Sequence, residues 1–187
     1  MGQIHAHEFL SLDGRFEDPS FTFEYGFDPK MGETLAGITG NSSAILLGRK
    51  TFEMFAPAWA GRTVEDDPGA PFFNDTTKYV VGANNPAVDW ANSERLGAYD
   101  INRIRQLKDE QPGDIYISGS GQLVRALLAE GVVDSLDLFV YPRVLGTGER
   151  LFADGEDVRL TLLNQQTYDN GVVHLAYGPA PQGEPTA

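Results

Sequence analysis

The stretch DIYISGSGQLVRALLAEG, residues 114–131, decides the fold. Its apolar first part predicts a buried strand that ends at Ser118, Gly119 and Gly121 form a turn, and the following residues have helical spacing up to Gly131. Glycine permits close backbone approach, and the first amides of a helix have no partner inside it. This order predicts a seat for an anion such as a pyrophosphate. A plain tight connection is the alternative.

A second turn of the same kind lies in AILLGRKTFEMF, residues 44–55. The predicted strand ends at Gly48, and Arg49, Lys50 and Thr51 begin a helix. Two cations in the first turn oppose the helix dipole, which prefers anions there. An external phosphate would explain them, whereas two solvated surface cations are the alternative. Two such turns suit a dinucleotide better than a mononucleotide.

The rest of the chain alternates strands and helices. We expect strands over residues 4–12, 44–49, 78–82, 159–167 and 172–177, another within 133–146, helices over 30–38 and 101–110, and a long surface loop over 60–75. This order predicts an α/β fold with a mostly parallel, helix-covered sheet and an antiparallel C-terminal edge. We expect residues 1–178 to form a single domain and 179–187 a disordered tail.

The composition excludes several classes of protein. The 187 residues include 27 acidic and 14 basic side chains, a formal charge of −13, and no cysteine. Disulfides, cysteine-ligated metals and thiol nucleophiles are therefore excluded. The negative charge argues against nucleic-acid binding. Since no apolar run reaches the length of a membrane helix and no signal-peptide pattern is visible, we expect a cytoplasmic protein with no membrane partner.

The first predicted strand carries unusual polar residues. His5, His7, Phe9 and Ser11 alternate onto one face of it. Histidine suits proton donation near neutral pH, so His7 is a candidate catalytic acid. The alternative is an exposed or edge strand with ordinary polar side chains, with water as the proton donor. His5, His7 and Glu8 lack the spacing of a zinc site, so we expect no metal.

Aromatic residues gather in the first half of the chain. In SFTFEYGF, residues 20–27, alternation puts Phe21, Phe23, Tyr25 and Phe27 on one side of an extended segment that would wall a flat ring. Core packing is the alternative. The residues that we expect at the substrate are Phe9, Tyr25, Phe27, Phe55 and Tyr141.

Five motifs in order resemble a known superfamily. They are SLDG at 11–14, LLGRKTFE at 46–53, KYVV at 78–81, ISGSGQL at 117–123 and VYPRVLGTGERLF at 140–152. The chain is similar to the dihydrofolate reductase-like superfamily, in a stand-alone form of the branch that includes the reductase domain of the riboflavin-biosynthesis deaminase–reductase. The resemblance implies a three-layer α-β-α sandwich around a mixed eight-stranded sheet. It also implies NADPH across the carboxyl ends of the strands.

The resemblance also assigns roles to residues. It places the cofactor phosphates on the turn at residues 48–51 and the pyrophosphate on the turn at residues 119–123. It places the nicotinamide near the SLDG segment, and the entrance to the substrate site near Gly146 and Gly148. These cofactor-binding residues are Leu10, Ser11, Gly48, Arg49, Lys50, Thr51, Ser118, Gly119, Ser120, Gly121, Gln122, Leu123, Gly146 and Gly148. Asp13, in the loop over the reactive ring, is the second candidate catalytic residue. Gly82, Ala83 and Asn84 are also expected to bind the cofactor. They stand where members of the family commonly have a serine, arginine or threonine that binds the 2′-phosphate of NADPH, so NADH is not excluded as the cofactor.

Two departures leave the substrate open. Ser118 stands where the riboflavin reductase has a substrate-holding glutamate, and the buried pterin-binding carboxylate of dihydrofolate reductase has only Glu24, Asp28 and Glu33 as candidates. We therefore expect an NADPH-dependent reductase that transfers a hydride to a small ring-containing carbonyl or imine. The alternatives are a non-catalytic dinucleotide-binding or regulatory protein and a flavin- or deazaflavin-using reductase. By resemblance, we expect a homodimer.

Overall fold

The structure is a computed structural model that describes residues 2–152, 155 and 157–181. The strands are β1 (Ile4–Ser11), β2 (Ser42–Gly48), β3 (Thr77–Val81), β4 (Ser93–Gly97), β5 (Asp114–Ser118), β6 (Ser135–Tyr141), β7 (Leu160–Thr167) and β8 (Val173–Pro179). The helices are the 3₁₀ helix η1 (Pro19–Tyr25), α1 (Pro29–Thr39), α2 (Arg49–Trp59), α3 (Ala70–Asp75), α4 (Ile101–Glu110) and α5 (Gly121–Ala129). The alternation of strands and helices confirms the predicted α/β class.

All eight strands form one sheet, in the order β4-β3-β2-β5-β1-β6-β8-β7. The strands from β4 to β6 are parallel, and β8 and β7 add the predicted antiparallel edge. Strand β1 lies between β5 and β6, so the reading of this segment as an exposed or edge strand is wrong. The polar side chains of β1 therefore lie inside the molecule.

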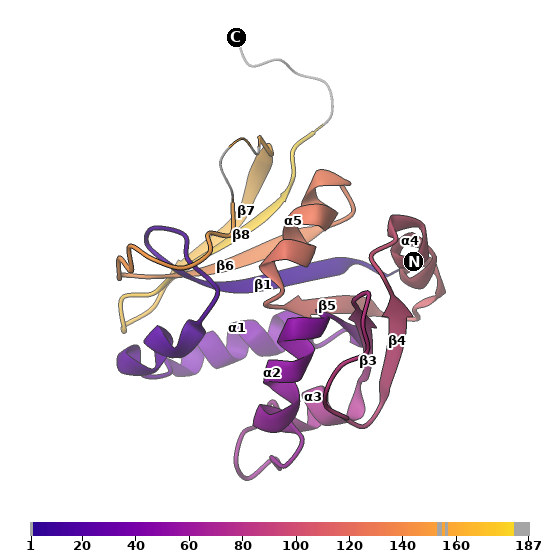
Figure 1. Ribbon diagram of the computed structural model, residues 1–187. Helices are drawn as coiled ribbons and strands as arrows, with labels where there is room; N and C mark the ends of the chain where they lie inside the picture. The colour runs from indigo at the N-terminus through magenta and orange to yellow at the C-terminus, as the bar shows by residue number, and fades with distance from the viewer. Residues whose placement is uncertain (1, 153–154, 156, 182–187) are drawn as a thin grey trace.

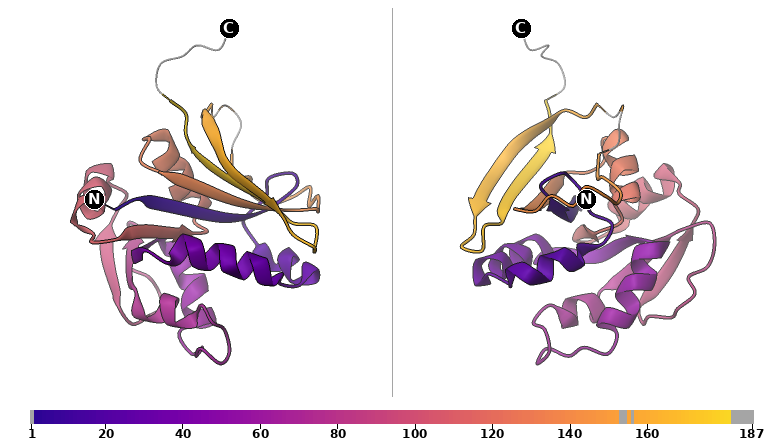
Figure 2. Two further views of the ribbon diagram at one scale, coloured as in Figure 1. Left: turned by 180° about the vertical axis from the view of Figure 1, so that it is seen from behind. Right: turned by 60° about the vertical axis from the view of Figure 1, so that its left-hand side comes forward.

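Helices cover both faces of the sheet, which makes the predicted three layers (Figures 1 and 2). On one face, the aliphatic side chains of α4 and α5 pack against β1, β5 and β6. On the other face, α2 and α3 pack an aromatic cluster against β2 and β3, and α1 and η1 pack a second one against β6. The parallel strands end together at one edge, where the two glycine turns lead into α2 and α5.

Three predicted details were wrong. Residues 20–27 are mostly the 3₁₀ helix η1 and not an extended segment, since Asp18 caps Ser20 N–H and Pro19 starts the turn. Part of the predicted loop 60–75 is the helix α3. Strand β4 was not predicted because SERLG is short, largely polar and mostly exposed.

The predicted domain boundary at residue 178 stays a prediction. Strand β8 includes Pro179, and residues 182–187 of the predicted tail lie outside the described residues. In the described part of the chain, no helix has the length and apolar character needed to cross a bilayer. Across the same residues, no three His, Asp or Glu side chains gather in a way that would hold a metal ion.

A buried lysine fixes α3 against β3. Lys78 has no solvent exposure, and its ammonium donates to the carbonyls of Phe73 at 2.8 Å, Asn74 at 3.1 Å and Thr76 at 2.8 Å. It also lies 4.6 Å from the centre of a ring of Trp90. The last carbonyls of a helix have no partner inside it, so Lys78 supplies their hydrogen bonds.

We expect Lys78→Met to destabilise the protein by about 2–4 kcal/mol, because it takes the lysine donor away from the carbonyls of Phe73 and Thr76, while Asn74 O keeps its bond from Asn92. Urea unfolding would measure the change in the free energy of unfolding. The control Lys30→Met, at an exposed position on α1, is expected to change it by less than about 0.5 kcal/mol. A Lys78→Met protein as stable as wild type would show that the three hydrogen bonds contribute little.

Candidate functional site

The two predicted phosphate turns lie side by side and are joined by one side chain. Gly48 N–H donates to the hydroxyl of Ser120 at 2.8 Å, and that hydroxyl donates to Thr51 Oγ1 at 2.7 Å. Neither α2 nor α5 has a side-chain cap at its N-terminus. The free amides of both helices are therefore held at one edge of the sheet, where they suit an anion with two phosphates.

The turn before α5 has an unusual backbone. Gly119 has φ +63°, and Ser120 has φ +66°, a left-handed conformation that non-glycine residues rarely adopt. A side chain at Gly121 would overlap the ring of Phe16. Gly119 has the positive φ that was predicted, Phe16 lies against Gly121, and the anion seat stays a prediction. Local strain of this kind gathers at functional sites.

The cations around the turns differ in their partners. Arg49 pairs with Glu53, one turn further along α2, at 2.7 Å. Its charge thus has a partner inside the helix, and an external phosphate is not needed to explain it. Lys50 is exposed and has no ion-pair partner among the residues described. Of the two predicted phosphate cations, Lys50 is the one left without an internal partner.

A cation that the sequence reading missed lies beside the turn after β3. Arg95, on β4, donates to Ala83 O at 2.6 Å, and a side chain at Gly82 would meet the stem of Arg49. Arg49 and Arg95 therefore approach the predicted 2′-phosphate turn, residues 82–84, from two elements. Arg95 could not be found from the sequence because the strand that carries it, β4, was not predicted, and only the pairing of β4 with β3 brings Arg95 to this turn.

The loop after β1 is bound to the loop after β6. Asp13 accepts hydrogen bonds from the backbone N–H groups of Leu145 and Gly146, both at 3.0 Å, and from Ser11 Oγ at 2.7 Å. Arg15 donates to Asp13 and to the carbonyls of the second loop. The Leu145 N–H and the Ser11 hydroxyl hold the pKa of Asp13 well below its usual range, so this carboxylate stays ionised and is poorly suited to donate a proton.

A polar stripe of buried side chains crosses the face of the sheet under α1. It consists of His7, Tyr116, Asp137 and His174. His7 Nδ1 lies 2.9 Å from the hydroxyl of Tyr116, and His174 Nε2 lies 2.8 Å from Asp137 Oδ1. Burial raises the pKa of the Tyr116 hydroxyl, and Ser118 opposes this shift. Burial lowers the pKa of His7 to about 4, so its ring is neutral at pH 7. His7 Nε2 and His174 Nδ1 are buried with no hydrogen-bond partner in the described structure.

The other face of β1 holds a buried acid that the sequence reading did not select. Glu8 is 2 % exposed, and its Oε1 has no hydrogen-bond partner among the residues described. Burial raises the pKa of its carboxyl to about 8. The available signal was an acid in the alternating series of Ile4, Ala6 and Leu10, which all point into the core.

The predicted aromatic wall is smaller than expected. Phe23 is 83 % and Phe27 64 % exposed, whereas Phe21 is buried, so the idea of one aromatic side over residues 21–27 is wrong. Tyr25 and Tyr141 lie with ring centres 5.5 Å apart, and Phe9 is 5.8 Å from Tyr141. These three rings lie at the end of the polar stripe. Phe55 packs against Phe73 under α2 instead.

The remaining candidates have structural partners. Asp28 caps α1 through Lys30 N–H and also accepts from Asp169 N–H. Glu24 forms an ion pair with Arg143. Glu33 is exposed on α1. None of the three acids points a free carboxylate into the core, so a pterin-binding acid is not visible among them.

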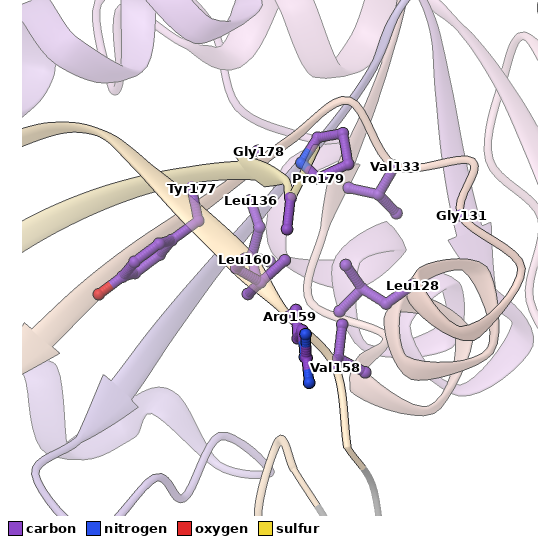
Figure 3. Close-up of a pocket in the computed structure, with 11 residues that line it drawn as sticks. Leu128, Gly131, Val133, Leu136, Val158, Arg159, Leu160, Tyr177, Gly178 and Pro179 are labelled. Atoms are coloured by element: carbon purple, nitrogen blue, oxygen red, sulfur yellow. The ribbon is translucent and has the colours of Figure 1, made fainter. Parts of the chain in front are cut away.

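A small apolar pocket lies elsewhere, at the amino end of β6 (Figure 3). Leu128 of α5, Leu136 of β6 and Leu160 of β7 line it. In the structure as described, no predicted site residue lies in its wall. The pocket is therefore at the opposite end of the strands from the glycine turns.

Comparisons with known proteins agree with this fold. The model of the RibD C-terminal domain family matches residues 3–174. The uncharacterized protein YyaP of Bacillus subtilis (strain 168) is 26 % identical over 175 residues, covering 90 % of each chain. A putative riboflavin biosynthesis protein from Shewanella sp. PV-4 has a TM-score of 0.73 at 15 % identity, covering 96 % of this chain and 99 % of the other. Dihydrofolate reductase from Enterococcus faecalis, solved with NADP(H), has a TM-score of 0.62 at 15 % identity, with 95 % and 96 % covered.

We expect Asp13→Asn to loosen the join between the two loops, because an amide cannot accept both backbone N–H groups as a carboxylate does. Hydrogen exchange of the Leu145 and Gly146 amides is expected to become faster. The control Asp18→Asn makes the same change of charge at the N-cap of η1, keeps an oxygen that can accept from Ser20 N–H, and should leave these two amides unchanged. Unchanged exchange in Asp13→Asn would show that the backbone contacts alone hold the loops.

Proposed function

Because the chain belongs to the RibD C-terminal domain family, we propose that it is an NAD(P)H-dependent reductase of a small, ring-containing carbonyl or imine substrate. Its fold is that of the dihydrofolate reductase-like proteins. The substrate class and the cofactor are part of the proposal. When bound, a reduced nicotinamide supplies the hydride.

The observation that carries the proposal is the Ser120 hydroxyl between the two turns. It brings two uncapped helix N-termini together, although the ring of Phe16 packs against Gly121 at the start of α5. This fits a ligand with two linked phosphates. The residues proposed to hold the cofactor are Leu10, Ser11, Gly48, Arg49, Lys50, Thr51, Gly82, Ala83, Asn84, Ser118, Gly119, Ser120, Gly121, Gln122, Leu123, Gly146 and Gly148.

We propose NADPH over NADH for an electrostatic reason. Arg95 donates to Ala83 O, and Arg49 lies against Gly82 although it pairs with Glu53. Guanidinium groups bind phosphate with charge-assisted hydrogen bonds, and we propose that a 2′-phosphate would compete with Glu53 for Arg49. In a chain with a formal charge of −13, two arginines at one turn favour an extra phosphate on the ligand.

The polar stripe supports a role for His7 at the substrate. We propose that the Tyr116 hydroxyl, 2.9 Å from His7 Nδ1, donates to that nitrogen. The neutral ring then carries its proton on Nε2, which is free to donate to an oxygen or nitrogen of the substrate. Phe9, Tyr25 and Tyr141 are the proposed walls beside it, and Phe27 and Phe55 stay predictions. We propose that Asp13 contributes by holding its loop in place.

We also propose a homodimer that covers the exposed edge strand β7. Leu162 and Leu163 are 48 % and 61 % exposed on this edge, and an open strand edge readily pairs with another chain. Leu163→Glu is expected to shift the protein toward the monomer in sedimentation velocity, with Leu12→Glu, at an exposed loop position, as the control. A wild type that sediments as a monomer at high concentration would contradict the proposal.

Titration with NADPH and NADH, followed by nicotinamide fluorescence, tests the cofactor. We expect saturable binding, tighter for NADPH, and about fivefold weaker binding in Ser120→Ala, since losing one hydrogen bond costs about 1 kcal/mol. The control Ser93→Ala alters an exposed serine on β4 and should bind as wild type does. No binding of either dinucleotide would overturn the proposed function. Binding without oxidation by a wide carbonyl and imine panel would favour a non-catalytic protein.

A further inference from the structure

The most exposed large apolar side chains of the described residues lie in the segments that border the proposed substrate site. These segments are the loop after β1, the helix η1, the loop before α1 and the loop after β6. The exposed fractions are 83 % for Phe23, 66 % for Val144, 65 % for Leu12 and 64 % for Phe27. Single apolar residues are ordinary on a protein surface, whereas a group in one place marks a binding surface. We call these four side chains the apolar rim.

A hydrogen bond and an ion pair bring three of these segments together. Leu12 N–H donates to Arg143 O at 2.7 Å, which places the loop after β1 beside Val144. The Arg143 guanidinium forms an ion pair with Glu24, the neighbour of Phe23 in η1. Figure 1 shows the indigo loop after β1 beside the orange loop after β6. The apolar rim is therefore continuous from the first loop to η1.

The apolar rim borders the open end of the aromatic cluster under α1. Phe9, Tyr25 and Leu145 are partly buried members of this cluster, so they remain in contact with solvent. The hydroxyl of Tyr25 donates to Pro142 O at 3.4 Å, and Phe27 follows Tyr25 two residues later. A ligand that packs on Phe9 and Tyr25 therefore reaches them past the side chains of the apolar rim.

The two arginines beside the apolar rim are neutralised within the protein. Arg143 pairs with Glu24, and Arg15 lies 3.3 Å from Asp13 Oδ2. A phosphate or carboxylate on the substrate would have to displace one of these acids from its arginine. An uncharged group meets no such competition.

The remaining cations of these segments do not make the apolar rim positive. Lys30 is exposed at the start of α1, where Asp28 caps the helix. Arg150 ends the loop after β6 on its α5 side, since Arg125 of α5 donates to the Arg150 carbonyl at 2.8 Å. Over residues 12–30 and 142–150, acidic side chains outnumber basic ones. An anionic substrate group would therefore gain little from the surrounding charge.

We propose that the substrate is uncharged and carries an apolar extension beyond its ring, which the apolar rim binds. The ring packs on Phe9 and Tyr25, and the extension leaves the aromatic cluster between Leu12 and Phe23. Removing these apolar surfaces from water supplies the affinity. This inference rests on the proposed function and names its substrate class: ring carbonyls or imines with an alkyl or aryl substituent and no phosphate or carboxylate.

Two other occupants fit the apolar rim poorly. A stable interface between two proteins takes about 20–30 residues of each partner, whereas the apolar rim has four side chains. A membrane surface carries negative charge, which the formal charge of −13 opposes.

Nile red, an uncharged flat dye with a ring carbonyl whose fluorescence rises in apolar surroundings, is the first probe. We expect saturable binding by wild type and at least about fivefold weaker binding by the double variant Leu12→Ser/Phe23→Ser, because the dye loses apolar contact area. The control Met54→Ser/Val64→Ser changes two exposed apolar positions on α2 and in the loop after it, and should bind as wild type does. A double variant that binds the dye as tightly as wild type would overturn the inference.

A series of 4-alkylbenzaldehydes, from methyl to butyl, tests the substrate class by displacement of Nile red and by NADPH oxidation. We expect the affinity of wild type to rise about two- to fourfold with each added methylene, and this rise to shrink in Leu12→Ser/Phe23→Ser. In turnover the gain should lie in KM and not in kcat, because the chain is remote from the reacting carbon. An affinity independent of chain length would contradict the proposed class.

The charge arm compares 4-isopropylbenzaldehyde with 4-formylbenzoate, which carries a carboxylate of similar size. We expect wild type to bind the carboxylate at least about tenfold more weakly. Glu24→Gln releases Arg143 and should recover up to about fivefold of this loss without changing the binding of the isopropyl compound. The control Glu94→Gln, at an exposed position on β4, should behave as wild type does. Equal binding of the two compounds by wild type would overturn the exclusion of anions.

The outcomes distinguish this inference from the proposed function. If wild type binds NADPH and the ligands do not respond to the rim variants, the apolar substrate class is overturned while the reductase proposal stands. If the ligands respond but neither dinucleotide binds, the reductase proposal fails, and binding of an uncharged apolar ligand is supported. A wild-type dimer that Leu12→Ser/Phe23→Ser converts to a monomer in sedimentation velocity would make the apolar rim a contact between two copies and overturn the inference.

Discussion

The pair of hydrogen bonds made by the Ser120 hydroxyl is the contact on which the candidate site depends. It joins the end of β2 to the start of α5, although 72 residues separate Gly48 from Ser120 along the chain. The join is possible because β2 and β5 are neighbours in the sheet and parallel strands end at the same edge. The left-handed backbone at Ser120 persists because the surrounding contacts over-determine it.

The sequence predicts those parts of the fold in which local pattern and burial agree. The apolar runs that became β2, β3 and β5 are buried on both faces, and the glycines after two of them mark the turns. Strand β4 escaped prediction because its pairing with β3, and not its own composition, makes it a strand. Residues 20–27 alternate as a strand would, yet the Asp18 cap and Pro19 start a 3₁₀ helix, so local turn chemistry prevailed over periodicity.

The candidate site was predictable only in part, for a physical reason. The glycine turns follow from local sequence, but the partners of charged residues depend on distant segments. Asp13 looks like a free acid in the sequence, and only the folded chain brings Leu145 and Gly146 to it. The pairing of Arg49 with Glu53 is the exception, since a spacing of four residues on a helix places them together. Whether an arginine is free for a phosphate is therefore readable from sequence when its competitor lies on the same helix.

Strand β1 carries two buried polar side chains with hydrogen-bonding atoms left unsatisfied in the described part of the chain, and these lower the stability of the fold. Its two faces carry His7 and Glu8 at successive positions, each with a buried atom that no described residue satisfies. Apolar residues at both positions would avoid this cost, and Ile4 and Ala6, earlier in the same strand, are buried apolar residues. Local rules that a stable fold would obey are broken here at the level where β5 reaches the glycine turn. Because such violations in native proteins gather at functional sites, the unsatisfied atoms of His7 and Glu8 support the proposal that the middle of β1 belongs to the site.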